Sequence, residues 1–271
     1  MFNLFKKSNT WAVSIISLIF TLIPESLLEG YKLLTKCSDE INIVLIRVLI
    51  FITIFLLSML VNALYLHFRR KICIKGNNYT IHIKYGNLFK MSKCKKVIPF
   101  DECFTTSVGE KPSDINPDSI CGQYLTNNPI QDMKSLIDKA QLKPQKNRSK
   151  YQSKECYKSG KLVPNGDDLL LAFAKLDKNG LGRLSREEYL DCLSVLWEEI
   201  DKYYGQKDIC IPILGSGVTR INNTSLTQQE LLDIIICSYK LSPFKIKDPY
   251  KLYIACKRRD NFSLNKIGKS L

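Results

Sequence analysis

The sequence predicts an α/β protein with an N-terminal two-helix transmembrane hairpin, followed by a three-layer α/β/α domain. Two observations support this prediction. The longest apolar runs of the 271-residue chain all fall before residue 69. The rest of the chain alternates short strand patterns with amphipathic helix patterns, as layered α/β domains do. We therefore expect a membrane anchor over residues 1–71 and one soluble domain over residues 72–271.

The anchor is expected to contain two membrane-spanning helices. Residues 41–68 carry one charge, Arg47, and exceed the roughly 20 residues that a bilayer requires. Residues 11–28 are shorter and contain Pro24 and Glu25, which also fits a tilted span, a re-entrant segment or a signal peptide. No small-residue cleavage site follows, and a second apolar run comes soon afterwards, so a hairpin is favoured.

Basic residues at both ends of this hairpin predict its orientation. Lys6 and Lys7 precede it and Arg69, Arg70 and Lys71 follow it, whereas the connecting loop mixes both signs of charge. By the positive-inside rule both ends, and hence the soluble domain, lie in the cytoplasm.

In the soluble part, strands are expected first at residues 79–85 and 95–100, and residues 168–176 fit a buried strand or a short helix. A helix should then begin after Ser185, whose capping box is completed by Glu188. The remaining elements are a strand before the glycines at 215 and 217, a helix opened by Ser225 or Thr227, and a closing strand at 252–256.

The segment DICIPILGSGVTRI, residues 208–221, predicts an anion site. Its apolar run is typical of a covered strand, and Gly215 and Gly217 permit a turn whose backbone N–H groups point at one phosphate. The segment is not a dinucleotide fingerprint, because Arg220 occupies the position of the third glycine. Glycine turns also join strands to helices without binding anything.

The net charge of +14 is partly local. Residues 126–161 are expected to form an exposed basic insertion, and nine Lys and Arg against three acids fall within residues 129–161. Aromatic side chains are sparse there, which favours a solvated face near the membrane over a nucleic-acid site. The ten cysteines occur singly beside only two histidines, so we expect no metal site and a reducing compartment.

Residues 177–188 partly match a calcium-binding EF-hand loop. Asp177, Asn179 and Glu188 stand at ligand positions, but Leu181 offers no side-chain oxygen at another. The alternative is a polar turn that ends in the helix cap of Ser185, and this alternative is favoured.

Five blocks of sequence together resemble a known family. They are YGNLFK (85–90), KKVIPFDECF (95–104), SICGQYL (119–125), LWEEIDKYYG (196–205) and IPILGSGVTRI (211–221). In these blocks and in their order, the chain resembles the membrane-anchored macro-domain effectors of the Thoeris antiphage defence system. The resemblance covers nearly the whole chain and implies a macro-like domain with a mixed sheet.

The resemblance implies that the domain binds ADP-ribose. It places the diphosphate against one turn, whose last residue, Arg220, adds a positive charge. The residues of this turn are Gly215, Ser216, Gly217, Val218, Thr219 and Arg220. The helix that begins near Ser119 and Gly122 lies on the other side of the diphosphate.

On the adenine and ribose side, the resemblance implies contacts from Asn87, Leu88, Asp101 and Phe104. Asn87 stands where the family has an acid that reads adenine, and its amide oxygen can still accept a hydrogen bond. Asp101 and Phe104 replace two asparagines on the ribose side, which favours a binder over a de-ADP-ribosylating enzyme. Asp101 fits equally well as the cap of the turn after its strand.

The resemblance further implies a non-enzymatic effector in the bacterial inner membrane. It senses an ADP-ribose derivative, histidine-ADP-ribose, made by a companion TIR-domain enzyme, then assembles as a homo-oligomer and disrupts the lipid bilayer. No cofactor and no nucleic acid are expected. Two alternatives remain: a hydrolase of ADP-ribosyl groups or NAD that activates water through Asp101, Glu102 or Asp167, and a calcium-responsive membrane module.

Overall fold

The computed structural model describes Ser14, Pro24 and residues 38–109, 114–217, 219–221 and 226–267. The chain divides into two compact units, Met1–Arg69 and Arg70–Leu271, which matches the expected boundary to within two residues.

The first unit contains the long helix α2, Asp39–Phe68. Its 30 residues extend over about 45 Å, and it is the one helix in the described part of the chain that is long and apolar enough to cross a membrane. It begins two residues before the expected span and ends where the span was expected to end. The other expected span, residues 11–28, lies outside the described residues apart from Ser14 and Pro24.

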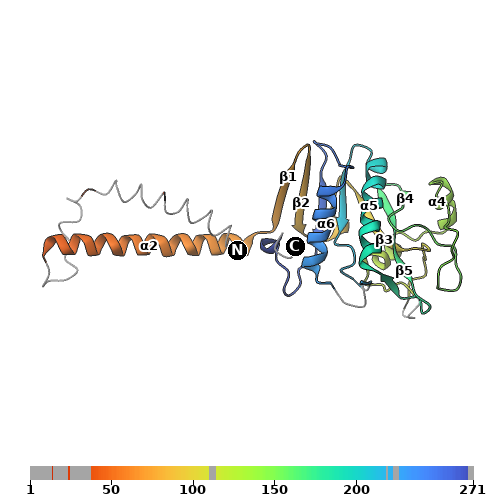
Figure 1. The fold of residues 1–271 in the computed structure, drawn as a ribbon, viewed down its shortest axis with the longest axis horizontal. Helices are drawn as coiled ribbons and strands as arrows, with labels where there is room; N and C mark the ends of the chain where they lie inside the picture. Colours follow the sequence, from red (N-terminus) through yellow and green to blue (C-terminus); the bar gives the residue numbers. More distant parts are fainter. Residues whose placement is uncertain are drawn as a thin grey trace. The chain divides into compact units, whose positions relative to one another are not determined.

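The second unit is built on a nine-stranded mixed sheet (Figure 1). The strands run in the order β1-β2-β9-β7-β3-β5-β6-β8, and β4 pairs with β5 outside this path. Their bounds are β1 (Lys71–Gly76), β2 (Tyr79–Tyr85), β3 (Cys94–Asp101), β4 (Leu162–Asn165), β5 (Asp168–Leu176), β6 (Gly182–Leu184), β7 (Asp208–Pro212), β8 (Arg220–Ile221) and β9 (Leu252–Cys256).

The centre of the sheet is parallel. β2 pairs with β9, β9 with β7, β7 with β3, and β3 with β5, all in parallel. β1 is antiparallel to β2, β4 and β6 are antiparallel to β5, and β6 pairs in parallel with β8. The segment 168–176 is therefore a strand, and its nearly continuous apolar run fits a strand covered on both faces. Because the central strands run in one direction, the loops after β3, β5, β7 and β9 meet at one edge.

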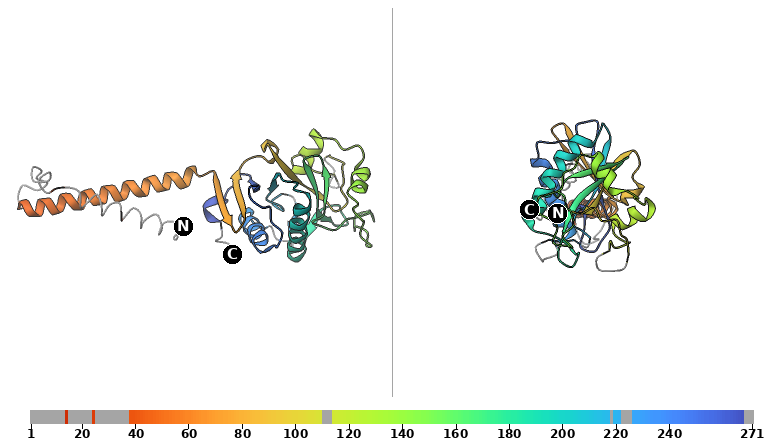
Figure 2. Two further views of the ribbon diagram at one scale, coloured as in Figure 1. Left: turned by 90° about the horizontal axis from the view of Figure 1, so that it is seen from above. Right: turned by 90° about the vertical axis from the view of Figure 1, so that its right-hand side faces the viewer.

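Helices cover both faces of the sheet, as the three-layer prediction required. On one face α5 (Arg186–Tyr203) and α6 (Gln228–Leu241) lie side by side, and the Trp197 indole N–H donates to the Ser238 hydroxyl at 2.8 Å. The other face is covered by α3 (Ile120–Asn127), α4 (Met133–Lys139) and the 3-10 helix η2 (Leu88–Lys90). Figure 2 shows the two pairs of α-helices on opposite sides. A second 3-10 helix, η3 (Leu264–Lys266), lies near the C-terminus.

Both predicted helix caps are present. Ser185 and Glu188 form a complete capping box at the start of α5. Thr227 is the N-cap of α6 and forms the same kind of capping box with Glu230. The other residue expected to begin this helix, Ser225, lies outside the described residues.

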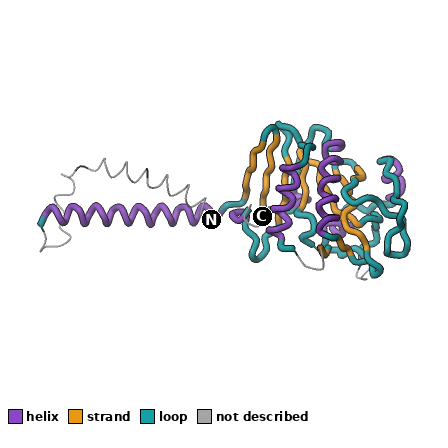
Figure 3. Tube along the Cα trace, in the orientation of Figure 1, coloured by secondary structure: helices purple, strands orange, loops and turns teal. Residues whose placement is uncertain are grey.

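The basic insertion is less exposed than expected. It contains α4, and its long loops after that helix (Figure 3) return to the sheet, where Ser149, Cys156 and Tyr157 are buried. The Tyr157 backbone N–H donates to the Glu102 carbonyl at 2.8 Å. The other residues of the insertion are mostly exposed or half-buried, as predicted; the few buried ones were not predicted because they bury individually and leave no periodic pattern.

Candidate functional site

A cleft of about 500 Å³ opens where the carboxyl ends of the parallel strands meet. Asp101 ends β3, the hairpin tip Gly180–Gly182 follows β5, and the turn 213–217 follows β7. Lys257 and Arg259 follow β9, and the start of α3 closes the remaining side. Open α/β sheets bind ligands outside the carboxyl ends of their strands, so this cleft is the candidate site.

Two carbonyl groups at the start of the turn after β7 are hydrogen-bonded. The Ile213 carbonyl accepts from the Ser216 hydroxyl at 2.7 Å, and the Leu214 carbonyl accepts from the buried Tyr189 hydroxyl at 3.0 Å. Within the described part of the chain, the N–H groups of Gly215, Gly217 and Thr219 have no acceptor. A turn with satisfied carbonyls and open N–H groups can bind an anion.

The two glycines of this turn differ in what they require. Gly215 has φ +80°, and a Cβ there would lie 3.0 Å from the Ile221 Cδ1 atom. Gly217 has open space around the position of a Cβ. Gly215 is thus needed for the fold of the turn, whereas Gly217 keeps the approach to the turn clear.

Two further members of the predicted turn are described less fully. Val218 lies outside the described residues. The backbone of Arg220 pairs with that of Arg183 in the parallel β6–β8 ladder, which fixes the end of the turn against the β5–β6 hairpin.

The wall opposite the turn is the beginning of α3. Ser119 lines the cleft and caps this helix, because its hydroxyl accepts from the Gly122 N–H at 2.9 Å. Gly122 itself does not line the cleft. A Cβ on Gly122 would lie 2.2 Å from the Asn116 carbonyl oxygen, so this glycine allows the preceding loop to pack against the helix.

Asp101 caps the turn after its strand, which is one of the two roles that the sequence left open. One carboxylate oxygen accepts from the backbone N–H of Cys103 at 2.8 Å and of Thr105 at 3.3 Å, which caps the turn after β3. The side chain also lines the cleft. Burial raises the pKa of this carboxyl above its ordinary value, although the two N–H groups oppose that shift.

Three residues expected on the adenine and ribose side lie outside the lining of the cleft. Asn87 caps η2 through a 2.9 Å bond from the Phe89 N–H to its side-chain oxygen. Leu88 and Phe104 are buried in the core between the sheet and α3. The sequence blocks that suggested a binding role therefore have local structural roles here.

Sequence reasoning missed several residues that line the cleft. Lys257 and Arg259 bring two cations to it, whereas Arg258 between them lies 5.2 Å from the Tyr85 ring centre. The run of three basic residues directly after the closing strand was a usable signal. The tip Gly180–Gly182 was also missed, because it was considered only as part of a calcium loop.

The calcium-like loop is a polar turn in this structure. One oxygen of Asp177 accepts from the N–H groups of Asn179 at 2.9 Å and Leu181 at 3.0 Å, and the other forms a 2.7 Å ion pair with Arg183. Glu188 completes the helix cap. In the described ranges, no group of three potential metal-ligating side chains comes together.

Comparison with known proteins identifies the family. The family model described as "Thoeris protein ThsA, Macro domain" matches residues 81–257, from within β2 to just beyond β9. This chain belongs to the ThsA macro-domain family. It is therefore a Thoeris defence protein with a macro domain, and the matched range includes every residue that lines the cleft except Arg259.

One relative extends the likeness beyond the macro domain. The Thoeris protein ThsA of Bacillus amyloliquefaciens (strain Y2) is 29% identical over 269 residues, covering 96% of this chain and 88% of that protein. Among solved structures, a mutant Oceanobacillus iheyensis macrodomain with ADPR matches at TM-score 0.46 and 9% identity, covering 70% of this chain and 91% of that one. The macrodomain of Thermus aquaticus DarG matches at TM-score 0.40 and 14% identity, covering 65% and 97%.

Proposed function

We propose that this ThsA-family chain is a membrane effector whose macro domain senses an ADP-ribose derivative. The observation that carries the proposal is the turn after β7: three of its N–H groups have no acceptor among the described residues, and their residues line a cleft that also contains two cations. The Thoeris family supplies the biological context. Following the resemblance in sequence, the proposed signal is histidine-ADP-ribose made by a companion TIR-domain enzyme.

The cleft offers a separate partner for each part of such a ligand. The N–H groups of Gly215, Gly217 and Thr219 would bind the diphosphate, and Lys257 and Arg259 would neutralise its charge. Asp101 would accept a hydrogen bond from a ribose hydroxyl. The apolar strand residues at the floor of the cleft, such as Ile213, leave room for a ring.

The same geometry favours a binder over a hydrolase. Asp167 precedes β5 and forms an ion pair with Lys207 at 2.7 Å, so it lies at the amino end of the strand, about 30 Å from the carboxyl end. Glu102 does not line the cleft. Asp101 is the one member of the three proposed water-activating acids at the site, and two backbone N–H groups already bind one of its oxygens.

The link to the membrane is short. Only Arg69 and Arg70 separate the end of α2 from the beginning of β1. We propose that α2 and residues 11–28 form a hairpin in the bacterial inner membrane with the macro domain in the cytoplasm. A ligand that favours one arrangement of macro domains would then shift the protein toward a homo-oligomer that disrupts the bilayer.

The test uses Gly217→Glu in the full-length protein, because the new carboxylate enters open space and should repel a diphosphate without disturbing the fold. Gly86→Glu is the matched control: its Cβ also meets nothing within 4 Å, and Gly86 lies outside the lining of the cleft. Calorimetric titration in nanodiscs should compare ADP-ribose, NAD and histidine-ADP-ribose, alongside growth of cells that also express the TIR-domain enzyme.

We expect Gly217→Glu to lose ligand binding and toxicity together while it still inserts in the membrane, and Gly86→Glu to keep all three. If Gly217→Glu no longer bound ligand but remained toxic, the proposal that the macro domain is a sensor would be refuted. Release of free ADP-ribose or nicotinamide by the wild-type protein would establish the hydrolase instead.

A further inference from the structure

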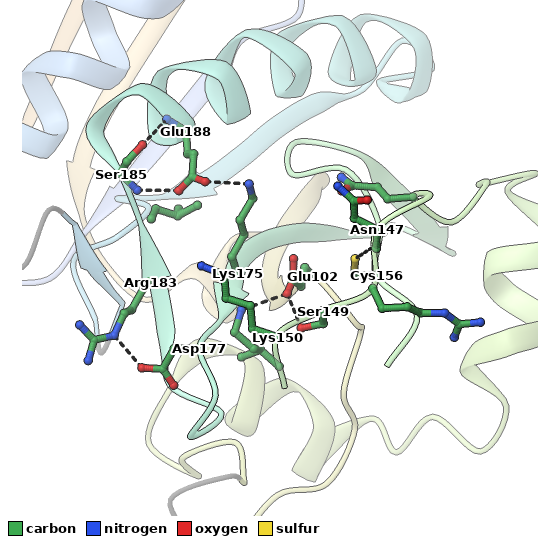
Figure 4. A pocket seen from close by; sticks show the side chains of 14 residues that line it. Glu102, Asn147, Ser149, Lys150, Cys156, Lys175, Asp177, Arg183, Ser185 and Glu188 are labelled. Atoms are coloured by element: carbon green, nitrogen blue, oxygen red, sulfur yellow. Dashed lines mark hydrogen bonds and ion pairs between the residues drawn. The ribbon is translucent and has the colours of Figure 1, made fainter. Parts of the chain in front are cut away.

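A second cavity, of about 440 Å³, has no part in the function proposed above. Three of its lining residues each directly follow a residue that lines the cleft. These pairs, with the cleft residue first, are Asp101 and Glu102, Ala174 and Lys175, and Gly182 and Arg183. Successive residues of extended chain point to opposite sides, so this cavity lies across the β5–β6 hairpin from the cleft. Only Leu176 lines both. Loops of the basic insertion form its other wall (Figure 4).

A buried carboxylate forms part of this cavity. Glu102 is 5% exposed, and one of its oxygens accepts from the Ser149 hydroxyl at 2.5 Å and from the Leu176 N–H at 3.2 Å. Its other oxygen has no partner among the described residues, and Figure 4 shows it directed away from Ser149. No lysine or arginine of the described chain forms an ion pair with Glu102. A buried carboxylate without a cation is costly, and a cationic ligand would relieve that cost.

The cations around the cavity are unequally engaged. Lys175 forms an ion pair with Glu188 at 2.7 Å, and Arg183 pairs with Asp177 at 2.7 Å. Lys150 is exposed and has no ion pair within the described part of the chain. The cavity thus combines one carboxylate oxygen of Glu102 that has no described partner with the ammonium group of Lys150, whose charge also acts on Glu188.

We propose that this cavity binds a small zwitterion of the amino-acid class. The ligand's ammonium group donates to the unpaired oxygen of Glu102, and its carboxylate pairs with Lys150. The polar side chains of Gln145 and Asn147 also line the cavity and offer further hydrogen bonds. The volume lies within the usual range for small-molecule sites. This site does not depend on the ligand of the cleft.

Calorimetric titration of the full-length protein in nanodiscs tests the proposal with glycine, L-glutamate, L-lysine and L-histidine as probes. Methylamine and acetate, which each carry one of the two charges, are the probe controls. We expect at least one amino acid to bind with one site per chain, and neither control compound to bind at the same concentration. Amino-acid binding should persist in Gly217→Glu, which separates this site from the cleft.

Two substitutions locate the site. Glu102→Gln keeps the shape of the side chain and removes its charge, and should weaken amino-acid binding by roughly tenfold or more. Lys150→Met alters an exposed side chain that supports no described contact, so it should fold normally and also weaken binding. Asp191→Asn is the control, because Asp191 is exposed on α5, lies outside the lining and forms no ion pair in the described part of the chain.

The proposal fails if no amino acid binds at millimolar concentration. It also fails if binding is unchanged in both Glu102→Gln and Lys150→Met, or if methylamine or acetate binds as tightly as the amino acids. Should Glu102→Gln prove unstable, the result with Lys150→Met decides.

Discussion

The hydroxyl of Tyr189 donates to the carbonyl of Leu214 at 3.0 Å, and this bond holds the turn after β7 against α5. Tyr189 lies in α5 and is completely buried, with its ring packed edge-on against Phe173. Because the carbonyl is held inward, the neighbouring N–H groups remain available to the cleft.

Replacing Tyr189 with Phe should therefore affect both stability and binding. The ring packing is retained, but the Leu214 carbonyl loses its partner in a buried environment, which costs about 1–3 kcal/mol. Denaturant unfolding should show this loss, and calorimetry should show weaker ADP-ribose binding. Tyr204→Phe is the control, since the Tyr204 hydroxyl forms no bond in the described structure. Equal unfolding free energies for the two variants would contradict the prediction.

The two glycines of the turn should respond differently to alanine. Gly215→Ala places a Cβ at positive φ and 3.0 Å from Ile221, so we expect a loss of about 1 kcal/mol or more. Gly217→Ala enters open space and should change the unfolding free energy by less than about 0.5 kcal/mol. Thermal and denaturant unfolding measure both, and similar losses at the two positions would refute this description of the turn.

The cations after β9 should contribute long-range attraction to an anionic ligand. Replacing Lys257 and Arg259 with Gln should weaken ADP-ribose binding by roughly tenfold at low salt, with a smaller effect at high salt. Arg258→Gln should have little effect, because that side chain packs on Tyr85. Titrations at two ionic strengths provide the measurement, and a loss that does not depend on salt would argue against an electrostatic role.

Asp101 should make stability depend on pH. Burial raises its pKa in the folded state above the ordinary value of 3.8. Its contribution is therefore fully present below the unfolded pKa and is lost as the pH rises through the folded pKa. Asp101→Asn retains the oxygen that accepts from Cys103, so it should gain stability relative to wild type between about pH 4 and pH 7. Unfolding curves across that range would contradict the prediction if the difference stayed constant.

Calcium should not stabilise the protein. Both oxygens of Asp177 are already engaged, by two backbone N–H groups and by Arg183, and Glu188 caps α5. Thermal unfolding of the full-length protein in calcium and in chelator should give the same midpoint. A reproducible increase with calcium, lost in Asp177→Asn, would restore the calcium interpretation.

The sequence by itself determined the division into two units, the long apolar helix whose expected range 41–68 lies within α2, the strands expected at 79–85, 95–100 and 252–256, and the two capped helices. It also located the turn that begins at Gly215. These features depend on interactions within a few residues: apolar periodicity, a Ser or Thr cap with its Glu three positions on, and glycine where φ is positive.

The tertiary structure alone decided which side chains reach the cleft. Lys257, Arg259 and the tip Gly180–Gly182 join it because strand order brings the ends of β5, β7 and β9 together, and no local pattern encodes that order. The same order excludes Asp167, at the opposite end of its strand, and places Asn87 and Phe104 outside the lining. Local hydrogen bonds and periodicity are determined by neighbouring residues, whereas a cleft assembled from four separate loops is determined by long-range pairing.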